Sequence, residues 1–150
     1  MRVFTDLDEF ASARGQTLGT TPWHTLTQER VNLFADATDD HQWIHVDPER
    51  AAEGPFGTTI VHGFLTLSLL PWLSTQIYRV DGVRMGINYG LNKVRFPNPV
   101  TVGSRVRGVA ELIDVTDVDG GKQAVVRYTI EIDGEKKPAC VAEFVSRLIR

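Results

Sequence analysis

The chain has 150 residues, of which 42% are hydrophobic and 23% charged, and its formal net charge is -3. This length and composition are typical of one globular domain, so we expect residues 1–150 to form a single domain with a substantial core. The negative charge, without a clustered basic surface, gives no reason to expect a nucleic-acid partner. A single cysteine, Cys140, excludes an intrachain disulfide.

No run of about 18 consecutive apolar residues occurs, so we expect no transmembrane helix and no membrane partner. The first residues, Met1 to Asp6, lack the apolar core of a signal peptide. A cytoplasmic protein is therefore the default expectation.

The first quarter of the chain is predicted to contain a helix and a strand. Residues 6–14 read as a short helix that ends at Gly15. Residues 20–26 read as a strand, and Pro22 within it indicates an edge position or an irregular start.

Two further helices are predicted from their capping residues. Thr27 is a favourable N-cap for a helix that ends near Asp39. Asp47 and Pro48 form an N-cap with proline at the first helical position, which opens a short helix through Ala52. The segment between these helices, residues 39–45, reads as a loop.

The most apolar segment follows, from His62 to Tyr78. It is hydrophobic on nearly all sides, which is typical of a buried helix. Pro71 in its middle removes one backbone hydrogen bond and is expected to kink it.

The second half of the chain alternates with a period of two and predicts strands. Residues 83–91 carry apolar residues on one parity, whereas Val94 and Phe96 carry them on the other, which indicates a β-bulge near residues 90–93. Strands are then expected over 105–115 and 124–132 and from Cys140 onward, with hairpin turns at 119–121 and 133–134. An antiparallel sheet around one long helix, an α+β fold, accommodates this pattern.

One cluster of residues indicates chemistry. Asp40 precedes His45 by five residues, and His62-Gly63 opens the apolar helix. An isolated carboxylate–imidazole pair of this spacing is common by chance. Its combination with His62-Gly63 and the buried helix is far more specific.

These segments resemble the MaoC-like, (R)-specific enoyl-CoA hydratases, and within that family the short, single-hotdog, mycobacterial-type enzymes. Residues 34–45 are similar to the family's hydratase motif, 60–65 to the start of its central helix, and 92–100 to the strand that follows. The resemblance covers about residues 27–115. It implies the hotdog fold, a homodimer, no cofactor, and a thioester substrate carried on coenzyme A or on acyl carrier protein.

The resemblance assigns the catalytic aspartate to Asp40, the catalytic histidine to His45 and the oxyanion-hole amide to Gly63. His62 is placed in the same oxyanion and substrate-binding group, with a role in holding the loop. Many members have a serine that helps orient the site where this chain has Pro71. Ser68, one helical turn earlier, is placed in this group as a substitute for that serine.

The expected reaction is the reversible hydration of a trans-2-enoyl thioester to a (3R)-3-hydroxyacyl thioester. It needs a base for the attacking water, an acid for C2, and donors for the enolate oxygen. Asp40 and His45 around one water can supply the first two on one face of the substrate. The Gly63 amide at a helix start has no intrahelical partner, and glycine permits close approach.

The motif departs from the family at two more places. Asp39 replaces a glycine, and aspartate tolerates a left-handed turn better than most residues. Gln42-Trp43 replaces an asparagine–proline pair, so a rigid residue is exchanged for a bulky aromatic one.

Other functions remain alternatives. A (3R)-hydroxyacyl-carrier-protein dehydratase would use the same residues, and a non-catalytic acyl-CoA-binding module would not need Asp40. A hotdog thioesterase typically relies on a carboxylate in the central helix, and residues 64–76 contain none. There is no cysteine cluster, so we expect no metal site.

Overall fold

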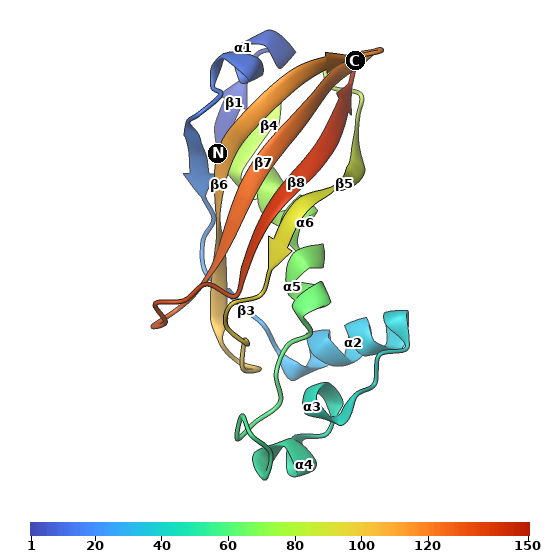
Figure 1. Cartoon of the computed structure of the whole chain (residues 1–150), viewed down its shortest axis with the longest axis vertical. Helices are drawn as coiled ribbons and strands as arrows, with labels where there is room; N and C mark the ends of the chain where they lie inside the picture. Colours follow the sequence, from blue (N-terminus) through green and yellow to red (C-terminus); the bar gives the residue numbers. More distant parts are fainter.

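A computed structural model describes all 150 residues as a curved antiparallel sheet with helices on one face and at one end (Figure 1). The strand order is β2-β6-β7-β8-β5, and β3 also pairs with β6. This arrangement confirms the predicted α+β hotdog fold. The strands of this sheet are β2 (Thr17–Thr20), β3 (His24–Thr25), β5 (Met85–Arg95), β6 (Arg105–Val118), β7 (Gly121–Ile132) and β8 (Cys140–Ile149).

Six helices accompany the sheet, and α2, α3 and α4 lie together near the start of α5 (Figure 1). None of the helices combines the length and the apolar character needed to cross a membrane. The helices are α1 (Leu7–Ser12), α2 (Gln28–Thr38), α3 (Trp43–Val46), α4 (Pro48–Ala52), α5 (Gly63–Ser68) and α6 (Leu70–Ile77).

The capping predictions are confirmed. The Thr27 side chain accepts a hydrogen bond from the Arg30 amide at 3.2 Å, and the Asp47 side chain accepts one from the Arg50 amide at 3.1 Å. These bonds satisfy first-turn amides that a helix leaves without a partner. The Asp47 cap directly follows residues 39–46 and fixes one end of the segment that carries the candidate catalytic pair, whereas Thr27 fixes the start of α2, the helix that leads into it.

The strand predicted over 20–26 is wrong in its extent. The chain instead forms β2 and β3, which are separated by Pro22. Proline has no N–H to donate to the neighbouring strand, so pairing with β6 is interrupted there. A parallel pair outside the main sheet, β1 (Arg2–Phe4) with β4 (Tyr78–Val80), was not predicted either.

The single kinked helix predicted over 62–78 is two helices, α5 and α6, which meet at Leu69. The Leu69 amide bonds to the Thr66 carbonyl in a tighter turn, while the Leu73 amide still reaches the Leu69 carbonyl at 2.9 Å. Pro71 offers no amide to continue the ladder, which explains the break just before it. The helices are also less enclosed than expected, because Phe64 is 68% and Trp72 40% exposed.

The predicted bulge in β5 is confirmed. Its pairing with β8 shifts register between Asn88 and Gly90 and again between Leu91 and Val94. As a result, the Val94 side chain faces the core and packs against the buried core residues. The rest of β5 lies at the edge of the sheet with large apolar side chains exposed, which are Met85, Ile87, Tyr89 and Leu91.

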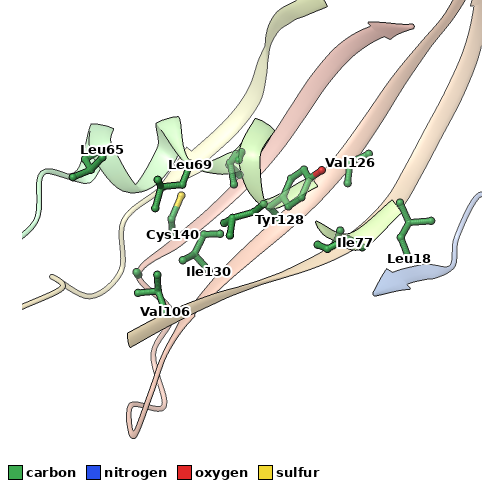
Figure 2. Packing of buried hydrophobic residues seen from close by; sticks show 14 of the residues in the cluster. Leu18, Leu65, Leu69, Ile77, Val106, Val126, Tyr128, Ile130 and Cys140 are labelled. Carbon is green, nitrogen blue, oxygen red and sulfur yellow. The ribbon is translucent and has the colours of Figure 1, made fainter. Parts of the chain in front are cut away.

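The core lies between the sheet and the helices α5 and α6. Figure 2 shows Leu69 from the helical layer directed toward Cys140 and Ile130 from the sheet. β7 alternates buried and half-buried positions along its length, as its period of two predicts. This packing fixes the helical layer against the sheet, and with it the position of the α5 N-terminus.

Candidate active site

Asp40 leaves the end of α2 through a left-handed turn. Asp39, the C-cap, has φ 60°, which is the conformation that a glycine would adopt most easily. The replacement of the family's glycine by Asp39 therefore preserves the turn. The Asp40 side chain is 51% exposed, and its Oδ1 accepts one long hydrogen bond, 3.4 Å, from the Gln42 amide.

His45 lies on the helical turn α3, so the prediction of a continuous loop over 39–45 is wrong. Its ring is buried, and Nδ1 is 2.7 Å from the Ile60 carbonyl. A carbonyl only accepts, so Nδ1 carries the hydrogen and donates it, which leaves the Nε2 lone pair free. Burial is expected to keep this tautomer in place.

Gln28 supports His45, and sequence reasoning missed it. Its Nε2 donates to the His45 carbonyl at 2.7 Å, and its Oε1 accepts from the Thr59 hydroxyl at 2.6 Å. The amide thus joins α2, α3 and the segment before α5. A glutamine in the first turn of a helix gives no sequence signal of such a bridge.

The Gly63 amide opens α5 and donates no hydrogen bond within the chain. The ring of Phe96 covers its Cα, and a Cβ added there would lie 3.3 Å from the ring. A side chain at position 63 would therefore force Phe96 to move. Together with Asp40, His62 and Phe64, these two residues line a crevice of about 210 Å³.

The predicted residues converge. A carboxylate oxygen of Asp40 and one ring nitrogen each of His45 and His62 all lie within 4.8 Å of one another. Burial lowers the pKa of His45, and the neighbouring His62 lowers it further, whereas the hydrogen bond to Ile60 and the Asp40 charge raise it. The net lowering favours the neutral imidazole, the form that can accept a proton.

This shift has a measurable consequence. If neutral His45 is required, kcat/KM should decline on the acid side with a midpoint below pH 6.5, the ordinary histidine value, because the pKa of His45 is lowered. A pH–rate profile checks this expectation. His41→Asn is the control, because that exposed ring bonds Asp36 and its removal should leave the profile unchanged. An acid limb centred above 6.5 would contradict the assignment.

The same three side chains bear on the expectation of no metal site. The sequence argument considered only short spacings and missed that Asp40, His45 and His62 meet in space. However, the two imidazole rings are stacked, with centroids 3.9 Å apart and planes 23° from parallel. Lone pairs in nearly parallel planes do not converge on one ion, so the geometry does not favour a chelate, and the expectation stays a prediction.

Ser68 is not brought to the crevice. Its hydroxyl donates to the Phe64 carbonyl at 2.6 Å within α5. It faces a separate hollow of about 300 Å³ between the helices and the sheet edge. That hollow is lined by Leu67, Ser68, Leu70, Pro71, Asn88, Tyr89, Gly90, Leu91 and Phe144. Any role of Ser68 toward a substrate therefore lies along this hollow rather than beside Asp40.

Trp43, which replaces the motif's proline, anchors the neighbouring helix. The Trp43 ring packs so closely on Gly54 that a Cβ added to that glycine would lie 3.0 Å from the ring. The Arg50 guanidinium lies 4.4 Å from the ring centroid. The exchange thus trades the rigidity of proline for packing against α4.

Comparisons with known proteins agree with this geometry. Residues 9–134 match the family model of the MaoC like domain. The chain is 61% identical over 150 residues to 3-hydroxyacyl-thioester dehydratase Z of Mycobacterium tuberculosis, covering 99% of both chains. It is 48% identical over 144 residues to nodulation protein N of Rhizobium leguminosarum, covering 93% of this chain and 89% of that protein.

Among solved structures, the (R)-hydratase from A. caviae involved in PHA biosynthesis is similar, with a TM-score of 0.74 and 28% identity. The likeness covers 90% of this chain and 96% of that one. The chain therefore belongs to the MaoC-like dehydratase family and is a hydro-lyase.

Proposed function

We propose that the protein catalyses the reversible addition of water to a trans-2-enoyl thioester, giving a (3R)-3-hydroxyacyl thioester. Asp40 and His45 act on the water, and the Gly63 amide binds the thioester oxygen. The observation that carries this proposal is the meeting of the Asp40 carboxylate with the buried His45 ring, beside an amide that has no partner.

The chemistry divides among these groups. The water lies between the Asp40 carboxylate and His45 Nε2, and one of them takes its proton as the oxygen attacks C3. The same group then passes that proton to C2, because neither the carboxylate nor the bare Nε2 holds another proton to give. Since one water between the two groups supplies both the oxygen and the proton, both additions occur on one face of the double bond. The negative charge that develops on the thioester oxygen is stabilised by the Gly63 N–H, since an unpaired donor needs no reorganisation.

The apolar hollow beside Ser68 is the proposed site of the acyl chain. Its helical lining begins at Leu67, one helical turn after Gly63, so an acyl group whose carbonyl meets Gly63 is proposed to extend along α5 into it. Lys93 and Arg95 take part in no ion pair with a carboxylate and are available to the phosphates of coenzyme A. Arg105 is not, because it pairs with Asp133. A coenzyme A thioester is thus the substrate form we propose.

Purified protein incubated with 2-enoyl-CoA thioesters of several chain lengths tests the proposal. The expected result is loss of the conjugated enoyl absorbance and formation of the (3R) alcohol. Parallel assays with the same enoyl groups on acyl carrier protein distinguish the two carriers. Absence of turnover on both would contradict a catalytic function.

We also propose that two copies of the chain associate through β5. This edge strand presents Met85, Ile87, Tyr89 and Leu91, each between 42% and 57% exposed. An exposed apolar edge strand is a pairing surface that monomeric proteins usually avoid. A second β5 placed against it would continue the sheet and cover these side chains.

Tyr89→Asp should convert the protein to a monomer, because it places a carboxylate in this surface. Sedimentation velocity gives the mass in solution. Val3→Asp is the matched control, since Val3 is 43% exposed but lies on β1, away from β5. A wild-type monomer, or a Tyr89→Asp protein that remains dimeric, would contradict this interface.

A further inference from the structure

His62 lines the crevice, yet the reaction proposed for Asp40, His45 and Gly63 does not use its ring. The side chain is 2% exposed. It packs against Phe34, with ring centroids 4.9 Å apart, and stacks on His45 at 3.9 Å. A buried imidazole in contact with both members of a catalytic pair invites a functional explanation.

The hydrogen bonds of His62 fix its tautomer. Nε2 is 3.0 Å from the main-chain carbonyl oxygen of Asp40. That oxygen only accepts, so Nε2 carries the hydrogen. Nδ1 is buried without a hydrogen-bond partner. The alternative tautomer would bury an N–H without a partner and aim a lone pair at the carbonyl, which costs more than an idle acceptor.

This bond is the main restraint on Asp40. Its carbonyl accepts no other hydrogen bond within the chain. The carboxylate itself is half exposed and accepts only the long hydrogen bond from Gln42, while His62 Nε2 also lies 4.0 Å from its Oδ2. Without the Nε2–H of His62, the residue that follows the left-handed turn would have little to define where its carboxyl group lies.

The second restraint acts on His45. Its Nδ1–H is tied to Ile60, which leaves rotation of the ring about that bond. The His62 ring lies against the His45 ring at a plane angle of 23° and blocks this rotation from one side. One side chain therefore contacts both groups that must meet the same water.

We propose that His62 is a positioning residue, which holds the Asp40 main chain through its Nε2–H and the His45 ring by stacking. This inference rests on the function proposed for Asp40 and His45. A displacement of about 1 Å in a reacting group can lower a rate by about 10²-fold, so loss of His62 should be felt in kcat although the proposed reaction does not use its ring.

Two amide substitutions separate the roles. A glutamine places its amide nitrogen near the position of Nε2, whereas an asparagine places it near Nδ1. His62→Gln should therefore keep the hydrogen bond to the Asp40 carbonyl and most of the activity. His62→Asn should lose both that hydrogen bond and most of the activity. We expect kcat of His62→Asn to fall by about 10²-fold with KM little changed, because substrate binding is not disturbed. Equal activity of the two variants, whether high or low, would overturn the proposal.

A double substitution tests whether His62 acts through Asp40. In an Asp40→Asn background, His62→Asn should cost much less than it does in the wild type, because residues that act as a unit are not additive. A full additional loss would show an independent role and overturn the proposal. If Asp40→Asn alone is fully active, the proposed function fails. If Asp40→Asn is inactive while His62→Asn is unimpaired, only the role of His62 fails.

The tautomer can be measured without any variant. Nitrogen-15 chemical shifts of the histidine rings should show His62 protonated at Nε2 and bare at Nδ1. A His62 ring protonated at Nδ1 alone would exclude the bond to Asp40. This readout remains decisive even if a His62 variant does not fold.

Discussion

Asp40→Asn is expected to lower kcat for enoyl-thioester hydration by about 10²- to 10⁴-fold, the range that a positioned proton-transfer group contributes. The substitution removes the charge and the basicity while it keeps the shape of the side chain. The fold should be unaffected, because the carboxylate is half exposed and accepts only the long bond from Gln42. Turnover of 2-enoyl-CoA and the thermal unfolding midpoint measure the two effects.

Asp36→Asn is the matched control. It makes the same change one helical turn earlier, at a side chain that is 72% exposed and bonded only to His41. This variant should retain wild-type turnover. If both variants turn over the substrate equally well, Asp40 takes no part in the reaction and its assignment is wrong.

His45→Asn is expected to cause a loss of similar size, about 10²- to 10⁴-fold in kcat, with the fold retained. The asparagine amide occupies the position of Nδ1 and can still donate to the Ile60 carbonyl, but nothing replaces Nε2. The variant thus removes the reacting nitrogen and leaves the structural one. Steady-state kinetics and chemical denaturation report the two properties separately.

His45→Ala gives the comparison for stability. It leaves the Ile60 carbonyl without its partner from His45, which should cost about 1–3 kcal/mol relative to His45→Asn. Both variants should be equally inactive. An active His45→Asn enzyme would mean that Nε2 takes no part in the chemistry.

The sequence predicted those parts of the fold that depend on neighbouring residues. Thr27 and Asp47 cap helices because their side chains reach amides three residues ahead. Gly120 and Gly134 have φ of 76° and 80°, as the predicted hairpin turns require. In each case the signal and the structure lie within a few residues.

Features that depend on distant residues were predicted poorly. The parallel pairing of Arg2–Phe4 with Tyr78–Val80 joins segments that carry no common pattern. The strand breaks at Pro22 because proline has no N–H to donate to the neighbouring strand β6, and the sequence does not show that β6 lies there. The helix break at Leu69 is by contrast a local effect of the amide that Pro71 lacks, and only its position was missed.

The candidate site shows the same division. Asp40, His45 and Gly63 could be assigned because a motif carries them. The contacts that hold them could not, since His45 bonds Ile60 and His62 bonds the Asp40 carbonyl across 15 and 22 residues of chain. The position of Ser68 was equally hidden, because its hydroxyl bonds within its own helix.

Hydration of a 2-enoyl-CoA in deuterium oxide, followed by NMR analysis of the product, tests the account most directly. If Asp40 and His45 act together on one face of the substrate, deuterium adds to C2 on the same face as oxygen adds to C3, and the alcohol has the (3R) configuration. Addition on opposite faces, or a (3S) product, would contradict it.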